Sequence, residues 1–152
     1  MKNKAIKMVK QRSSYRCVTA CLAMATGMSY KDAKSYIDSF GYHVRGEGCD
    51  MGSLTDAIND MWAHDMGDYR ASLHRQNDSE GVCDVADFAS GLFIVNAGNH
   101  AIVVCDGIAY DPAMTKDGFG GGISARVAPL TATTVTWIEE YISVTTPAGE
   151  GR

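Results

Sequence analysis

The sequence predicts an α+β domain in which an N-terminal helical half packs against a C-terminal antiparallel sheet. Apolar residues recur at helical spacing up to about residue 66. After Gly67 the segments become rich in β-branched and aromatic residues, which is typical of strands. A chain of 152 residues is long enough for one domain with its own core. We therefore expect a single domain over residues 1–152, with helices at about 11–66 and strands at about 67–146.

Three helices are expected in the first half. Residues 17–26 place apolar side chains on one face, and Gly27 is a natural C-terminal stop. The pattern repeats over residues 29–40, where Ser29 is the expected N-cap. We expect a third helix to begin with Ser53 as its cap.

The second half contains four segments with strand character. "YRASLHR" alternates in polarity, while "GLFIVNAG", "HAIVVCDGIAYDP" and "TTVTWIEEYISVTT" are rich in strand-forming residues. The glycine-rich stretch "DGFGGGIS" at 117–124 lacks the Gly-Lys-Ser/Thr ending of a phosphate-binding loop. We predict a surface loop there, near the cleft.

Composition excludes several classes of protein. No apolar run approaches the roughly 18 residues that a membrane span needs, and the basic N-terminus lacks the apolar region of a secretory signal. Six of the 14 basic residues fall in the first 16 positions, but the remainder carries eight basic against 18 acidic residues. Such an acidic body opposes binding to nucleic acid or an acidic membrane.

The five cysteines form an odd set with no repeating spacing, unlike a secreted disulfide scaffold. We expect a reducing cytoplasm, with most thiols acting as small apolar residues. The cysteines are Cys17, Cys21, Cys49, Cys83 and Cys105.

The sharpest local prediction is a hairpin in "HAIVVCDGIAYDPA". Asp106-Gly107 between two apolar runs is a strong signal for a two-residue type I′ turn. Such a turn pairs Cys105 with Ile108, so that His100 and Asp111 share one face as diagonal cross-strand neighbours. The register therefore predicts a carboxylate within reach of an imidazole, although each residue also has a purely structural interpretation.

Cys17 is expected to open a helix, where the positive end of the helix dipole lowers a thiol pKa. The neighbouring Arg16 could add to this effect. The alternative is a buried, inert cysteine, a description that fits Cys21 well because it lies one turn deeper.

Taken together, Gln11, Cys17, His100 and Asp111 resemble the papain-like cysteine peptidase pattern in their order and in the six-residue step from glutamine to cysteine. The blocks "Q…C.TACLAMATG.SY.DA" and "HAIVV.DGIAYDPA" look most like the small peptidases that process double-glycine leader peptides of bacteriocins. The resemblance covers roughly residues 11–34 and 92–113.

The resemblance implies a papain-like fold and a role for each of the four residues. Cys17 would be the nucleophile, His100 its ion-pair partner and proton donor, and Asp111 the residue that orients the imidazole. Gln11 would donate its side-chain amide to the oxyanion, beside the backbone N–H of Cys17. No cofactor is implied, and the partner would be a peptide or protein substrate. One departure is Val18, where the family usually has glycine and where a larger side chain could narrow the cleft or alter what reaches the thiol.

Three alternatives stay open from the sequence. The chain could be a catalytically silent binding module on a peptidase frame. It could be an amidase, isopeptidase or acyltransferase that uses the same residues. A metal site formed by Cys17, Cys21, His43 and Cys49 is weakly indicated, because the tight cysteine spacing of zinc sites is missing.

Overall fold

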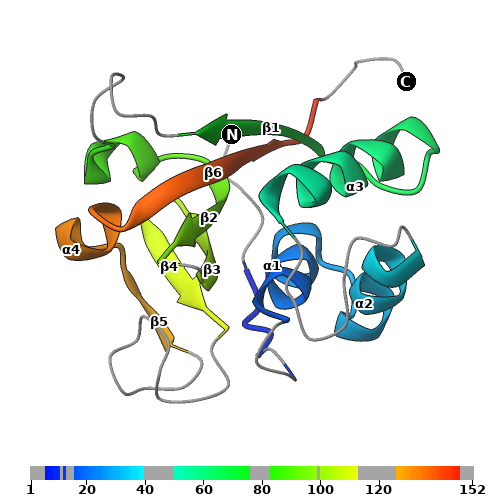
Figure 1. The fold of residues 1–152 in the computed structure, drawn as a ribbon, viewed down its shortest axis with the longest axis horizontal. Helices are drawn as coiled ribbons and strands as arrows, with labels where there is room; N and C mark the ends of the chain where they lie inside the picture. Colours follow the sequence, from blue (N-terminus) through cyan, green and yellow to red (C-terminus); the bar gives the residue numbers. More distant parts are fainter. Residues whose placement is uncertain are drawn as a thin grey trace.

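The computed structural model shows three helices, α1 to α3, beside an antiparallel sheet (Figure 1). The structure describes residues 6–10, 12, 16–39, 50–75, 83–98, 100–112 and 126–147. The helices precede the sheet in the chain, apart from a short helical turn before the last strand. The predicted α+β class is confirmed.

Helix α1 begins and ends where its sequence signals predict, and helix α2 begins as predicted, whereas residue 40, the expected end of α2, lies outside the described residues. Helix α1 spans Cys17–Thr26, and Gly27 follows it in the left-handed conformation at φ 78°. Helix α2 spans Tyr30–Ser39, and the hydroxyl of Ser29 accepts the backbone N–H of Asp32 at 3.1 Å. Ser29 is therefore the cap of α2, as predicted.

Helix α3 spans Met51–Ala63 and begins earlier than predicted. Its cap is Asp50, whose carboxylate accepts the backbone N–H of Ser53 at 2.8 Å. The Ser53 hydroxyl donates to the same carboxylate at 2.8 Å. Ser53 as the cap was thus wrong, because a charged acceptor three residues upstream takes its N–H.

The described strands form one sheet in the order β1-β6-β2-β3-β4-β5, with every neighbouring pair antiparallel. Strands β1 and β6 extend along the side nearest α3, whereas β4 and β5 lie at the opposite edge (Figure 1). The strands are β1 (Arg70–Arg75), β2 (Leu92–Ala97), β3 (His100–Cys105), β4 (Ile108–Asp111), β5 (Arg126–Pro129) and β6 (Ile138–Thr145).

Four further elements differ from the prediction. The strand expected from residue 133 begins at Ile138, because the helical turn α4 (Ala132–Val135) comes first. Its cap is Thr131, whose hydroxyl accepts the N–H of Thr134 at 3.1 Å, a local bond that competes with strand pairing. The 3₁₀ turn η1 (Val85–Phe88) and strand β5 were not predicted. The expected loop at 117–124 lies outside the described residues.

The β3–β4 hairpin has the predicted register. Cys105 pairs with Ile108 and Val103 with Tyr110. Asp106 and Gly107 have φ values of 48° and 82°, as a type I′ turn requires. Alternation along these strands therefore sends His100 and Asp111 to the same side.

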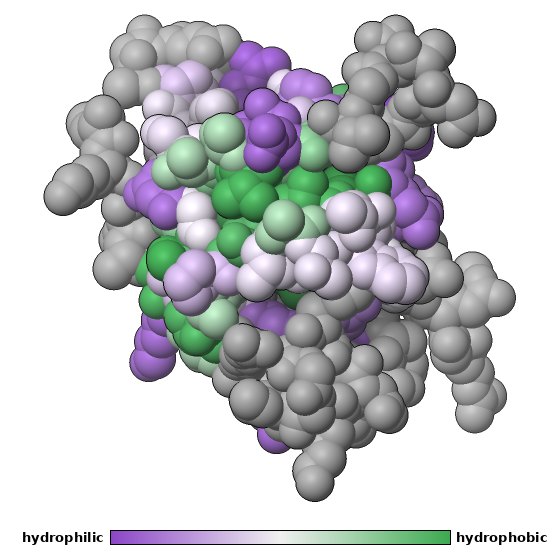
Figure 2. Space-filling model, turned by 90° about the vertical axis from the view of Figure 1, so that its left-hand side faces the viewer, coloured by the Kyte–Doolittle hydropathy of each residue, from purple (hydrophilic) through white to green (hydrophobic). Residues whose placement is uncertain are grey.

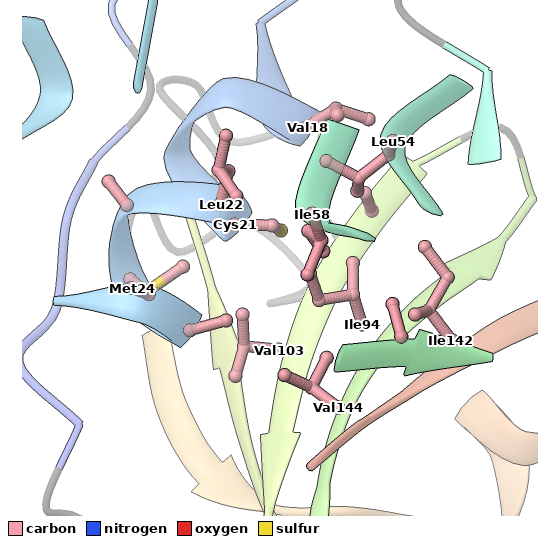
Figure 3. Packing of buried hydrophobic residues seen from close by; sticks show 14 of the residues in the cluster. Val18, Cys21, Leu22, Met24, Leu54, Ile58, Ile94, Val103, Ile142 and Val144 are labelled. Carbon is pink, nitrogen blue, oxygen red and sulfur yellow. The ribbon is translucent and has the colours of Figure 1, made fainter. Parts of the chain in front are cut away.

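Strand alternation gives the sheet two apolar faces. On the helical side, residues of β2, β3 and β6 pack against α1 and α3 (Figure 3). Leu22 of α1 and Ile58 of α3 are fully buried among them. Burying such side chains contributes about 1.5–3 kcal/mol each, so this cluster fixes α1 against the sheet.

The second cluster lies on the other face, where Ile102, Val104 and Val95 meet Phe88 of η1 and Leu130. Figure 2 views this side of the molecule and shows apolar residues gathered near its centre, with hydrophilic residues around them. Among the residues that the structure describes, no helix is both long and apolar enough to cross a membrane.

Truncation of Leu22 tests the role of the first cluster. Leu22→Ala should lower the free energy of unfolding by about 2–5 kcal/mol, because it leaves a cavity between α1 and its neighbours. Urea denaturation measures the change. As a control, Val127→Ala removes a side chain that is 50% exposed and should change stability by less than about 0.5 kcal/mol. Equal effects of the two variants would show that α1 is not fixed by this packing.

Candidate active site

Cys17 is the first residue of α1, so its backbone lies at the positive end of the helix dipole. The residue before it, Arg16, is the N-cap, and its side chain accepts no backbone N–H of the first turn. The α1 helix packs against β3 and β2. This packing brings the beginning of α1 to the beginning of β3, where His100 lies.

His100 and Asp111 form the hydrogen-bonded pair that the hairpin register predicts. The Nε2 atom of His100 lies 2.6 Å from Oδ1 of Asp111. The side chains are 18% and 6% exposed, respectively. A short bond between a carboxylate and a partly buried imidazole stabilises the imidazolium and fixes the ring orientation.

The His100 ring also hydrogen-bonds to the side chain of Cys17. Since Nε2 is used by Asp111, Nδ1 is the nitrogen left for the sulfur. Burial alone would lower the pKa of His100. The hydrogen bonds and charges of Asp111 and Cys17 outweigh burial and raise that pKa to about 9.

The pKa of Cys17 is shifted in the opposite direction from that of His100. Burial favours the neutral thiol, but the hydrogen bond to His100 favours the thiolate, as does the backbone N–H of Ala101. The charge of His100 and the N–H of Val18 act in the same direction. The net result is a Cys17 pKa below the ordinary value of 9.0. The contacts therefore shift Cys17 toward the thiolate and His100 toward the imidazolium.

The other described cysteines have raised pKa values. Burial raises the pKa of Cys21 well above 9.0, and the nearby Cys17 and Asp111 raise it further. Burial is also the main cause that raises the pKa values of Cys83 and Cys105, with Asp87 and Asp106 respectively adding to it. Cys21 is fully buried, as expected for an inert thiol one turn below Cys17.

Arg16 has partners on two helices. Its guanidinium lies 2.8 Å from a carboxylate oxygen of Asp38 on α2, and it donates to the Thr19 hydroxyl at 3.4 Å. The Arg16 side chain thus connects α1 to α2. The groups that lower the Cys17 pKa include His100 and backbone N–H groups, and an added effect of Arg16 stays a prediction.

Two sequence-based expectations involve residues that lie outside those described. Gln11, the expected oxyanion donor, is one of them. His43 and Cys49, which would complete a metal site with Cys17 and Cys21, are also outside. Within the described residues, no group of three or more His, Cys, Asp or Glu side chains is placed to hold a metal ion.

Sequence reasoning missed the contribution of the backbone. The N–H groups of Ala101 and Val18 contact the Cys17 sulfur, and a residue pattern carries no signal for them. The effect of Val18 on the cleft stays a prediction. The Val18 side chain is 4% exposed and points into the main apolar cluster (Figure 3).

Comparisons with known proteins support the fold. The chain matches no protein-family profile and no curated protein sequence. Among solved structures it is similar to a double glycine motif protease from an AMS/PCAT transporter, in complex with the leader peptide. The TM-score is 0.59 with 14% sequence identity, covering 94% of this chain and 93% of the other. The chain therefore has a papain-like cysteine peptidase fold.

The ion pair makes a specific prediction about stability. The raised pKa of His100 contributes stability that is present below pH 6.5 and lost as the pH rises through about 9. The lowered pKa of Cys17 has the opposite sense: its contribution is present above pH 9.0 and lost as the pH falls through the lowered value. Where Cys17 is a thiolate in the folded protein and a thiol in the unfolded chain, the proton that it releases on folding is the one that His100 takes up.

Cys17→Ala removes the group that releases this proton. While Asp111 still holds the imidazolium, the variant takes up a proton on folding, so its stability relative to wild type should fall as the pH rises above 6.5, by up to about 1.4 kcal/mol per pH unit. Urea denaturation at several pH values measures this slope. Parallel pH dependences in the two proteins would contradict the ion pair.

Proposed function

We propose that the protein is a cysteine peptidase that hydrolyses a peptide bond through Cys17, His100 and Asp111. The observation that carries this proposal is the continuous hydrogen-bonded chain from the Cys17 sulfur through the His100 ring to the buried Asp111 carboxylate. Along it, the thiol pKa is lowered and the imidazole pKa is raised. Nucleophilic thiol catalysis requires both shifts together.

The proposed reaction has two halves. In the first, the Cys17 thiolate attacks the scissile carbonyl, and His100 donates its Nδ1 proton to the departing amine as the C–N bond breaks, leaving a thioester. In the second, His100 takes a proton from water, and the resulting hydroxide attacks the thioester. The C–S bond breaks, and the acid product leaves while the thiolate–imidazolium pair forms again. Asp111 keeps the ring aligned through both halves.

The oxyanion that forms after each attack also needs hydrogen-bond donors. We assign this role to the Gln11 side-chain amide and the backbone N–H of Cys17, on the resemblance in sequence order. The N–H of Cys17 is at the first position of α1, where no earlier helical turn supplies an acceptor. Such donors act where charge develops in the transition state.

The substrate class that we propose is a peptide or protein. It is supported by the fold shared with a protease whose structure contains a leader peptide. Nothing in the described residues carries over a requirement for two glycines, so the cleavage sequence is left open. The same thiol chemistry would also serve an amidase, an isopeptidase or an acyltransferase.

Peptide turnover tests the proposal. Incubation with a proteome-derived peptide library should yield new N-termini, detected by mass spectrometry, and Cys17→Ala should abolish them. Cys83→Ala is the matched control and should leave turnover unchanged, because Cys83 is a partly exposed thiol with a raised pKa.

Gln11→Ala tests stabilisation of the oxyanion separately from the reactivity of the Cys17–His100 pair. It should reduce kcat by about 10²–10³ while leaving Cys17 alkylation intact. Absence of cleavage in the wild type, with Cys17 still reactive toward iodoacetamide, would contradict peptide hydrolysis. It would instead indicate a different acyl-transfer reaction or a binding module.

A further inference from the structure

The apolar side of the sheet that faces the helices ends in a row of polar residues. The register places Asn96 of β2 opposite Glu140 of β6, and Glu140 opposite Arg75 of β1. Asn96 and Glu140 follow the same alternation as Ile94 and Ile142, which pack toward the helices (Figure 3). The polar row of Asn96, Glu140 and Arg75 therefore lies on the helical side of the sheet.

The polar row lies at the end of the sheet where α1 and α3 begin. Thr26, the last residue of α1, lines a cavity together with Tyr69, which directly precedes β1. The other end of α1, at Cys17, therefore lies toward the end of β1, where Arg75 is found. A Cβ atom on Gly52, in the first turn of α3, would lie 3.7 Å from the Arg75 guanidinium. The nucleophile and the polar row thus share one end of the domain.

Glu140 supplies the shielded charge of the row, since its side chain is only 20% exposed. Its carboxylate accepts a hydrogen bond from the Asn96 side-chain amide at 3.3 Å and another from Nε of Arg75, also at 3.3 Å. Strong charge-assisted hydrogen bonds measure roughly 2.7–2.9 Å. Both partners therefore hold the carboxylate loosely, and a better-placed cation would bind it more strongly.

Arg75 is the partner that such a cation can replace. Its side chain is 68% exposed, and an exposed ion pair contributes little, because water screens it and two long side chains must be held in place. The amide of Asn96 is neutral, so it does not compete with a cation for the carboxylate. A lysine or arginine side chain from a bound peptide can therefore take the place of Arg75 on Glu140.

The position of the row also indicates which half of the peptide it would contact. Strand alternation places His100, the proposed proton donor to the departing amine, on the opposite face from the row. The acyl half stays attached to Cys17, which packs against the helix-side cluster that contains Ala101. Ala101 pairs with Asn96, so Glu140 lies two strand spacings away, about 10 Å. At about 3.3 Å per residue, an extended peptide covers this distance in three residues.

We propose that Glu140 is a specificity-determining residue that binds a lysine or arginine side chain in the acyl half of the substrate, in place of Arg75. This inference rests on the proposed function and adds a substrate class, peptides with a basic residue within three positions before the cleaved bond. Asn96 keeps the carboxylate oriented while the incoming cation donates to it, and Arg75 moves into solvent.

Affinity labels test this recognition without requiring hydrolysis. Acetylated tripeptide chloromethyl ketones alkylate Cys17, and a lysine is introduced at each of the three positions in turn. The twin of each probe carries norleucine, which lacks only the ammonium group. In the wild type, the best lysine probe should label Cys17 roughly tenfold faster than its twin, the effect of one hydrogen bond between charged groups. Mass spectrometry measures the rates, and equal rates at all three positions would overturn the proposal.

Glu140→Gln should abolish the preference for lysine, because it removes the charge and keeps the shape. The matched control is Glu139→Gln, which changes the exposed neighbouring carboxylate on β6 and should keep the preference. Alkylation by iodoacetamide should be the same in both variants, since neither residue belongs to the proposed catalytic group. A lysine preference that survives in Glu140→Gln would show that the cation binds elsewhere.

Arg75→Ala removes the competing cation, so the preference for lysine should increase, by up to about fivefold. Probes with glutamate test the opposite assignment. If they react fastest and Arg75→Ala abolishes their advantage, the row binds an acidic side chain through Arg75 and the proposal is wrong. Peptide turnover without lysine preference would contradict this inference alone, whereas lysine preference without turnover would support it and contradict peptide hydrolysis.

Discussion

The 2.6 Å hydrogen bond between His100 and Asp111 is the interaction on which the candidate site depends. A largely buried carboxylate is costly unless a partner compensates it, and a largely buried imidazolium is equally costly alone. Each of these two groups compensates the charge of the other, and contact with His100 lowers the pKa of Cys17. The hairpin turn sets the register that brings His100 and Asp111 together, and the packing of α1 brings the sulfur to them.

The candidate site lies at the N-terminus of helix α1 and beyond the end of the β3–β4 strand pairing. Helix α1 begins at Cys17, so its first N–H groups lack helical acceptors, and the β3–β4 ladder stops before Ala101. Backbone donors are therefore concentrated around one sulfur. The deeper part of the same helix is apolar: Cys21 is fully buried and its thiol is held neutral. Position along one helix thus separates a reactive thiol from an inert one.

Local chemistry made much of this arrangement predictable from the sequence. The Asp106-Gly107 turn fixed the hairpin register, and Gly27 and Ser29 marked helix ends, because each acts through its nearest neighbours. The failures have local causes too: Asp50 rather than Ser53 caps α3, and Thr131 starts a helical turn where a strand was expected. The contact between Cys17 and the backbone of Ala101 could not be predicted, since it depends on how α1 packs against the sheet.

We expect His100 to be an imidazolium at neutral pH, because Asp111 and Cys17 hold its proton. The ¹⁵N chemical shifts of its ring, assigned by comparison with His100→Gln, report the protonation state directly. They should show the imidazolium at pH 7.5, with a midpoint near pH 9, and the midpoint should fall in Asp111→Asn. A neutral ring at pH 7.5 in the wild type, or a midpoint that Asp111→Asn leaves unchanged, would contradict the ion pair and the peptidase mechanism built on it.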